Sequence, residues 1–145
     1  MFRGRSKHTL DEKGRLAIPT RFKDVLKEKG LNCLVVTNHL NCLWAFAQDD
    51  WRIIEEKAAN LSLMDNAVNT YRRYFISGAQ ECILKQGRIT IPPDLREIAG
   101  LKKDIMLVGE LKMFEIWDRE RWETEFQKAM DSFPDASQSL SELGI

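Results

Sequence analysis

The sequence predicts an α+β protein in which two similar halves share one hydrophobic core. The phrase "DEKGRLAIP" of residues 11–19 returns in altered form as "LKQGRITIP" at residues 84–92. Around each copy, short segments with alternating apolar residues, typical of strands, flank a segment with the apolar spacing of a helix. Each half contains only about 45 residues, too few to bury a stable core of its own. We therefore expect the two halves to pack together as one pseudo-two-fold unit.

The repeat extends well beyond the shared phrase. "HTLDEKGRLAIPTRF" aligns with "ECILKQGRITIPPDL", and "LVVTNHLNCLWAFAQDDW" aligns with "IMLVGELKMFEIWDRERW". We expect the Ser-rich end of the chain, "DSFPDASQSLSELGI", to be frayed or only weakly docked. The predicted organisation is a first domain at 5–50, a helical connection at 51–78, a second domain at 79–122, and a helix end with a polar tail at 123–145.

Within the first half, residues 8–18 predict a strand, a tight turn and a second strand, arranged as a hairpin or as strand-turn-strand. Gly14 can adopt the positive φ that a turn requires, and the apolar residues of "RLAIP" alternate as in a strand. "TRFKDVLKEKG" predicts a short helix with Thr20 as a candidate N-cap and Gly30 as its stop. "CLVVTNHLNCLWAFA" predicts two strands joined by a turn at residues 38–41. The second half repeats this order.

The connection at 51–78 predicts a helical hairpin. Its apolar residues recur at spacings of three and four, and Asp65 or Asn66 can cap a second helix. We expect this apolar stripe to pack against the domain rather than to recognise a partner. The stripe comprises Trp51, Ile54, Ala58, Leu61, Met64, Val68, Tyr71 and Phe75.

Charge is balanced over the 145 residues but is concentrated locally. The formal net charge is zero, yet residues 1–23 carry seven Lys or Arg and only two Asp or Glu. Because screening limits the relevant field to about 8–10 Å, such a patch can attract phosphate even on a neutral chain. The alternative is a solvated N-terminal arm with no partner.

Several features predict a cytoplasmic location. No run reaches the roughly 18 apolar residues needed to cross a bilayer. The basic start of the chain is not followed by the apolar stretch of a signal peptide. The three cysteines are odd in number and lack C-x-x-C spacing, so we expect buried, reduced thiols.

The sequence contains no recognisable catalytic pattern. Neither His8 nor His39 has a partner at the spacing of a metal site or a catalytic triad. A nucleophile elbow, a P-loop and a dinucleotide-binding glycine pattern are all missing. We therefore predict that the protein is not an enzyme.

The repeated turn suggests a different chemistry. A carboxylate at Asp11 can accept turn N–H groups and hold Arg15 in one orientation, from which a guanidinium can bind phosphate or guanine bidentately. Lys7 and Lys13 would add phosphate contacts that position the protein. The alternative is a structural turn whose exposed ion pair contributes about 0–1 kcal/mol. The spacing alone does not separate the two interpretations.

The opening "MFRGRSKHTLDEKGRLAIPTRF" strongly resembles the start of the bacterial MraZ family. "CLWAFAQDDW", "AQECILKQGRITIPPDLREIAGL" and "IMLVGELKMFEIWDRERW" resemble the rest of that family, so the resemblance covers residues 1–130. It implies an AbrB-like (SpoVT-AbrB) swapped-hairpin β-barrel, with two tandem copies per chain forming a pseudo-dimer.

The same resemblance implies a function. It implies a sequence-specific transcriptional regulator of the division and cell-wall gene cluster, which assembles into a ring-shaped homo-oligomer. Such a regulator binds short repeated elements of double-stranded DNA in its own promoter and associates with the nucleoid. No cofactor, membrane or small-molecule substrate is implied. The alternative is an antitoxin-like or structural protein-interaction module on the same fold, without DNA specificity.

The family phrase carries over to this chain residue by residue. In the first copy Asp11 and Gly14 support Arg15. In the second copy Gly87 supports Arg88, but Leu84 stands where the family has aspartate, so we expect Arg88 to be held less rigidly and Leu84 to extend the apolar face. The predicted DNA-binding residues are Arg3, Arg5, Lys7, Lys13, Arg15, Lys85 and Arg88.

Overall fold

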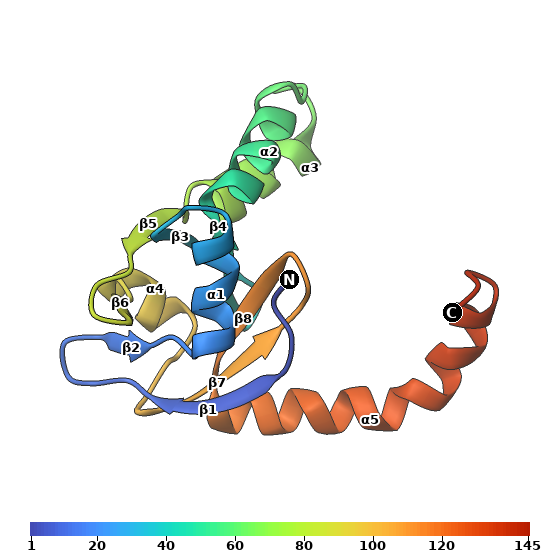
Figure 1. Ribbon diagram of the computed structural model, residues 1–145. Coiled ribbons are helices and arrows are strands. Elements are labelled where there is room, and N and C mark those ends of the chain that lie inside the picture. Colours follow the sequence, from blue (N-terminus) through green and yellow to red (C-terminus); the bar gives the residue numbers. More distant parts are fainter.

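Strands from the two halves of the chain are interleaved in one six-stranded antiparallel sheet. The computed structural model describes residues 1–145, and its sheet has the order β1-β7-β8-β4-β3-β5 (Figure 1). Exchanging the halves reproduces this order in reverse, which places a pseudo-two-fold axis between β4 and β8. The strands are β1 (Arg5–Thr9), β3 (Cys33–His39), β4 (Cys42–Ala47), β5 (Gln80–Ile83), β7 (Asp104–Gly109) and β8 (Met113–Asp118).

A separate two-stranded ribbon pairs β2 (Arg15–Ala17) of the first half with β6 (Arg88–Thr90) of the second. β1 and β2 are joined only by an isolated bridge between Leu10 and Leu16, because β1 pairs with β7 and β2 pairs with β6. Of the two arrangements predicted for residues 8–18, the structure therefore has the strand-turn-strand: the segment closes in a tight turn, but its two strands pair mainly with strands of the other half. The swapped-hairpin arrangement with two copies per chain is confirmed.

Two short helices follow the ribbon strands at equivalent places, α1 (Thr20–Glu28) and α4 (Pro93–Ile98). The N-cap position of α1 is Pro19 and no side chain caps the helix, so the predicted Thr20 cap is wrong. Gly30 ends α1 as predicted, with a φ of +69°, and the N–H of Leu31 donates to the carbonyl of Leu26 over 2.9 Å.

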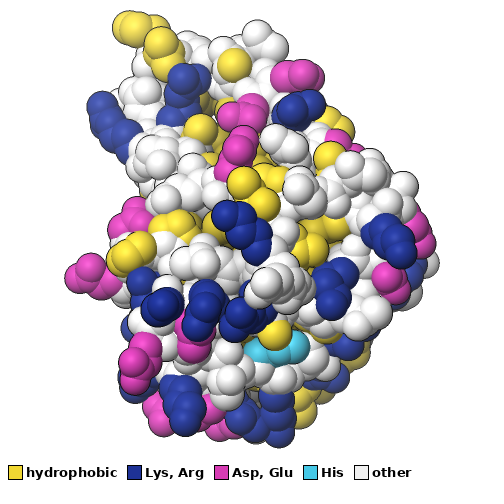
Figure 2. All heavy atoms as spheres, turned by 60° about the vertical axis from the view of Figure 1, so that its left-hand side comes forward, with side chains coloured by type: hydrophobic (Ala, Val, Ile, Leu, Met, Phe, Trp, Pro, Cys, Tyr) yellow, Lys and Arg dark blue, Asp and Glu magenta, His cyan; other side chains and the backbone are white.

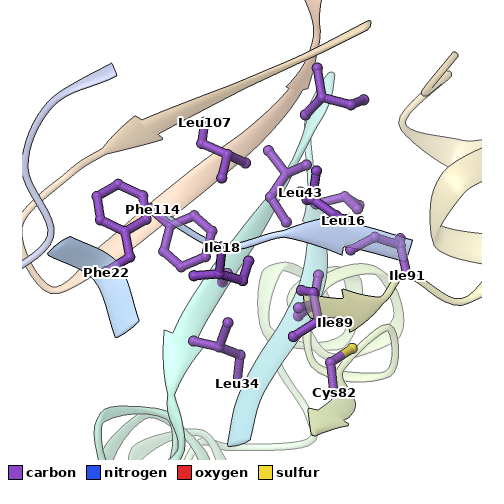
Figure 3. Close-up of a cluster of buried hydrophobic side chains, with 14 of the residues drawn as sticks. Leu16, Ile18, Phe22, Leu34, Leu43, Cys82, Ile89, Ile91, Leu107 and Phe114 are labelled. Atoms are coloured by element: carbon purple, nitrogen blue, oxygen red, sulfur yellow. The ribbon is translucent and has the colours of Figure 1, made fainter. Parts of the chain in front are cut away.

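One hydrophobic core lies between the sheet and the ribbon, and it contains side chains from both halves (Figure 3). Leu16 of β2 lies opposite Ile89 of β6, and both are almost completely buried. They face the sheet residues Leu34, Leu107 and Phe114. Because each half supplies only part of this core, the halves stabilise each other.

The opposite, outer face of the sheet is partly covered by a helical hairpin. Its elements are α2 (Gln48–Ala59), α3 (Asn66–Tyr71) and the π-helical turn η1 (Arg72–Ile76). Asp65 caps α3 by accepting the N–H of Ala67 over 2.8 Å, as predicted. Phe75 is buried in a cluster with Phe46 and Trp51, which confirms the packing of this part of the stripe.

At the tip of the hairpin, however, the apolar stripe is not buried. Leu61 is exposed, and Met64 is 91% exposed. The prediction that the whole stripe packs against the domain is wrong at these two positions. The hairpin extends beyond the sheet there (Figure 1), so its tip finds no apolar surface of the chain to cover.

The last helix, α5 (Arg119–Ser141), leads away from the body of the molecule (Figure 1). It continues through Pro134 and includes most of the segment for which a polar tail was expected. The residues beyond Met130 are almost all exposed, which agrees with weak docking but not with an irregular chain. None of the helices combines the length and the apolar character that crossing a membrane requires.

Candidate nucleic-acid interface

The ribbon of β2 and β6 presents two arginines on its outward face. Arg15 lies opposite Thr90 and Arg88 lies opposite Ala17, whereas the intervening Leu16 and Ile89 point into the core. Side chains alternate along a strand, so Arg15 and Arg88 share the face that points away from the core. They are diagonal neighbours across the ribbon, a relation that places such residues about 7–8 Å apart.

The first turn is organised by the carboxylate of Asp11. The backbone N–H of Gly14 donates to the Asp11 carbonyl over 3.0 Å, and the N–H of Asp11 donates to the Arg15 carbonyl over 3.1 Å. Gly14 has a φ of +81°, so residues 12–14 form the three-residue hairpin loop that ends in a glycine bulge. The carboxylate accepts the backbone N–H groups of Lys13 (3.0 Å) and Arg15 (2.8 Å).

The same carboxylate fixes the arginine side chain. Nε of Arg15 donates to Oδ2 of Asp11 over 2.5 Å, and the terminal nitrogens of that guanidinium make no hydrogen bond within the chain. The N–H of Arg15 is the main reason that the pKa of Asp11 lies below its ordinary value, and the guanidinium lowers it further. The turn therefore presents an oriented arginine whose outer edge remains free to bind.

The second turn has a different register. The N–H of Arg88 donates to the Lys85 carbonyl over 3.0 Å and the N–H of Lys85 donates to the Arg88 carbonyl over 2.9 Å, with Gln86 and Gly87 at φ +52° and +75°. These are the features of a two-residue type I′ turn. The side chain of Leu84 packs against the core and has no acceptor atom, so the Arg88 N–H donates to the Lys85 carbonyl rather than to a side chain at position 84.

This arrangement confirms the expectation that Leu84 extends the apolar face. It leaves the Arg88 side chain without a carboxylate partner. A hollow of about 330 Å³ lies beside the second turn and is lined by Arg15, Ile83, Lys85, Gln86, Arg88 and Thr90, so both ribbon arginines border it. The two turns therefore border one cationic surface but hold their arginines in different ways.

Each turn is also braced by a cation from the other half of the chain. The guanidinium of Arg96 from α4 lies against Gly14, where a Cβ would approach Cζ of Arg96 to 2.8 Å. Nζ of Lys23 from α1 lies against Gly87 in the equivalent way, at 3.2 Å. Sequence reasoning missed this pair, although the alignment of "TRFKDV" with "PDLREI" places Lys23 and Arg96 at the same position of the two halves.

The N-terminal basic residues do not join this surface. Arg5 and Lys7 lie opposite Val108 and Met106 in the sheet register, so they share the outer face of the sheet with them. The guanidinium of Arg5 lies over the ring of Phe126 in α5, 4.6 Å from its centre. The predicted single patch of N-terminal and turn cations is therefore divided between two faces.

Arg3 is also held apart from the turns. Its carbonyl accepts Nε of Arg21 over 2.8 Å, at the start of the chain. The side of the molecule that carries the turns, which faces the viewer in Figure 2, shows Lys and Arg side chains in a row across its lower half, with acidic side chains below and beside them.

The histidines do not form a reactive site. His8 shares a 2.8 Å hydrogen bond with Ser6, and His39 stacks on Trp44. Burial is the main cause that lowers the pKa of both imidazoles below the ordinary value. No three His, Cys, Asp or Glu side chains meet as metal ligands. The three cysteines are free and buried, as predicted.

Comparison with known proteins gives consistent matches over the whole chain. The family described as "MraZ protein, putative antitoxin-like" matches residues 1–74 and again residues 75–142. A protein of Syntrophobacter fumaroxidans is 42% identical over 145 residues, which cover 99% of this chain and 97% of the relative. Proteins of Natranaerobius thermophilus (36% over 146 residues) and Desulfitobacterium hafniense (42% over 147 residues) match over 100% of both chains. All three relatives are named "Transcriptional regulator MraZ".

Proposed function

The chain belongs to the MraZ family, and on that premise we propose that it is a transcriptional regulator that reads double-stranded DNA with its two ribbon turns. The observation that carries this proposal is the pair Arg15 and Arg88 on the outward face of the β2–β6 ribbon. The major groove of B-DNA admits a two-stranded ribbon, and arginine bound bidentately to guanine is the commonest specific contact there.

The two arginines have different roles in this proposal. Arg15 makes the principal base contact, because Asp11 already holds its Nε and little rotamer freedom remains to be lost on binding. Arg88 makes a weaker contact, since no carboxylate orients it. Lys13 and Lys85 are exposed at the two turns and bind phosphates, which position the protein without reading sequence.

The N-terminal cations have a smaller role. Arg5 and Lys7 lie on the other face of the sheet, and Arg3 lies at the far end of β1. We assign them a long-range attraction for DNA rather than direct contact. The proposed direct contacts with DNA are therefore fewer than the sequence predicts, because Arg3, Arg5 and Lys7 are not among them.

We further propose the finer features that the family resemblance implies. One pair of turns offers few contacts, so several chains linked in a ring would bind repeated promoter elements with much higher overall affinity than one chain. The elements would lie upstream of its own gene in the division and cell-wall gene cluster. The protein would work in the cytoplasm, at the nucleoid, without a cofactor.

Fluorescence anisotropy with a labelled duplex from the DNA upstream of its own gene tests the proposal. One guanine contact is worth about 1–3 kcal/mol, so Arg15→Ala should weaken binding about 5- to 150-fold and Arg88→Ala less. Arg5→Ala is the matched control and should change affinity little. Affinity should also fall steeply with salt. Equal binding by Arg15→Ala and the parent protein would refute the proposed role of the turn.

A further inference from the structure

The second ribbon turn presents one uncharged amide among its cations. Gln86 is exposed at the tip of this turn, and its side chain makes no hydrogen bond within the chain. It lines the hollow that both ribbon arginines border. The equivalent position of the first turn is occupied by Lys13. The two turns therefore differ at their tips as well as in the way they hold their arginines.

The amide of Gln86 differs from the neighbouring cations because it can donate and accept hydrogen bonds at once. The lysine and arginine side chains of the two turns have N–H donors but no acceptor. In the major groove, guanine offers the two acceptors N7 and O6, whereas adenine offers the N7 acceptor beside the N6 amino donor. Donors alone therefore match guanine, and the paired donor and acceptor of a glutamine amide match adenine.

The turn holds Gln86 in a fixed place beside Arg88. Gln86 and Gly87 are the two central residues of the type I′ turn. Two backbone hydrogen bonds between Lys85 and Arg88 close this short loop (2.9 and 3.0 Å), so its tip has little freedom to move relative to the ribbon. When the ribbon directs Arg88 at the edges of the bases, Gln86 therefore lies close to the same bases.

An exposed apolar side chain borders the same hollow. Ile83 at the end of β5 is 51% exposed, although the preceding Cys82 lies in the core. Side chains alternate along a strand, so Ile83 points away from the core, and the other residues that line the hollow are polar or charged. The C5-methyl group of thymine projects into the major groove, where an apolar side chain can contact it. One A·T base pair therefore offers a partner to both Gln86 and Ile83.

We propose that the second turn reads an A·T base pair in the major groove, with Gln86 bound to the adenine and Ile83 in contact with the methyl group of the thymine. Arg15 at the first turn reads guanine, so one ribbon selects two different base pairs. The recognised element is therefore asymmetric, although the fold is pseudo-symmetric. The inference rests on the proposed DNA-reading function and names the bases that one part of the surface selects.

The test is a base-pair scan by fluorescence anisotropy, on the duplex from the DNA upstream of its own gene with each base pair replaced in turn. At one position the parent protein should prefer A·T over the other pairs, and Gln86→Ala should show no preference there. A good bidentate contact discriminates by about 5- to 150-fold, which is the preference expected of the parent protein. Alanine and glutamine both have a Cβ, so the backbone at φ +52° is equally strained in the variant.

Changes of single atoms in the DNA test each contact. 7-Deazaadenine lacks the N7 acceptor, so it should weaken binding by the parent protein but not by Gln86→Ala. Uracil lacks only the methyl group of thymine, so it should weaken binding by the parent protein about fourfold and leave Ile83→Ala unaffected. Gln86→Glu should change the preference at that position to cytosine, whose N4 amino group donates to a carboxylate. Lys85→Ala is the matched control at the same turn and should weaken binding to all duplexes by one factor.

Two outcomes for Gln86→Ala would overturn the inference. The variant could keep all base preferences of the parent protein, or it could bind every duplex more weakly by one factor, as a phosphate contact requires. The same scan with Arg15→Ala tests the proposed function through the preference for guanine. If Arg15→Ala loses that preference and Gln86→Ala loses none, only the present inference fails. Unchanged preferences in Arg15→Ala would instead contradict the proposed DNA-reading role.

Discussion

Replacing Gly14 with alanine should cost much more stability than the same change at Gly87, its equivalent in the second half. Both glycines have positive φ, which costs about 1–2 kcal/mol for a residue with a Cβ. At Gly14 the new Cβ would also meet the carbonyl of Ile91 at 2.9 Å. The backbone would have to shift there and weaken the 2.8 Å bond from the Ile91 N–H to the Gly14 carbonyl, a further loss of about 0.5–1.5 kcal/mol.

We therefore expect Gly14→Ala to lower the free energy of unfolding by about 2–3 kcal/mol and Gly87→Ala by about 1–2 kcal/mol. At Gly87 the nearest atom is the mobile end of Lys23, at 3.2 Å, which can move aside. Urea unfolding followed by tryptophan fluorescence measures both values. Equal losses, or a larger loss at Gly87, would contradict the conclusion that the first turn is locked against the backbone of the other half.

Three further predictions address the turn, the hairpin and the thiols. NMR titration should give Asp11 a pKa below the ordinary value. The contribution of Asp11 to stability is therefore complete above about pH 4 and is lost as the pH falls through the pKa of the folded state. Arg15→Ala should raise the pKa of Asp11 only partly, because the backbone N–H of residue 15 remains. A return to the ordinary value would show that the guanidinium dominates. Phe75→Ala should cost about 3–5 kcal/mol in urea unfolding, and a loss below 1 kcal/mol would mean that the hairpin is not packed on the sheet. Burial raises the pKa of Cys82 to about 12, so a thiol reagent at neutral pH should label all three cysteines only after denaturation, and rapid labelling of the native protein would contradict their burial.

The parts of the fold that the sequence predicts well are those set by local chemistry. Gly14 adopts the positive φ of a turn, Gly30 ends α1, and Asp65 caps α3. Each outcome depends on one side chain and on its neighbours in the chain. The turn predicted at residues 38–41 is shorter, because β3 extends to His39 and only residues 40–41 form the turn, with Leu40 at a φ of +52°.

The pairing of strands is harder to predict, because the sequence allows β1 to pair either with β2 or with a strand of the other half. The alternation of apolar residues fixes which side of a strand is buried, but not which strand pairs with it. For this reason the sequence does not separate Arg5 and Lys7 from the cations of the turns. Their pairing with Val108 and Met106 directs them to the outer face of the sheet instead.

The second turn shows how one substitution changes a site beyond its own position. With leucine at position 84, no carboxylate accepts the amide of Arg88, and the closing pair moves to Lys85 and Arg88. The sequence indicated the missing carboxylate but not the shorter loop. The helical spacing of apolar residues also predicts burial of Leu61 and Met64, which are exposed. Such spacing shows which side of a helix is apolar but not how far the surface that covers it extends.

The interleaved sheet has a consequence for synthesis on the ribosome. β1 is among the first segments to emerge, but its partner β7 follows about 100 residues later, which takes about 5–20 s at usual elongation rates. During that interval β2 also lacks its partner β6. Neither half can complete its pairing while the chain is growing, so folding must wait for the second half and then form contacts of long sequence separation, which is intrinsically slow.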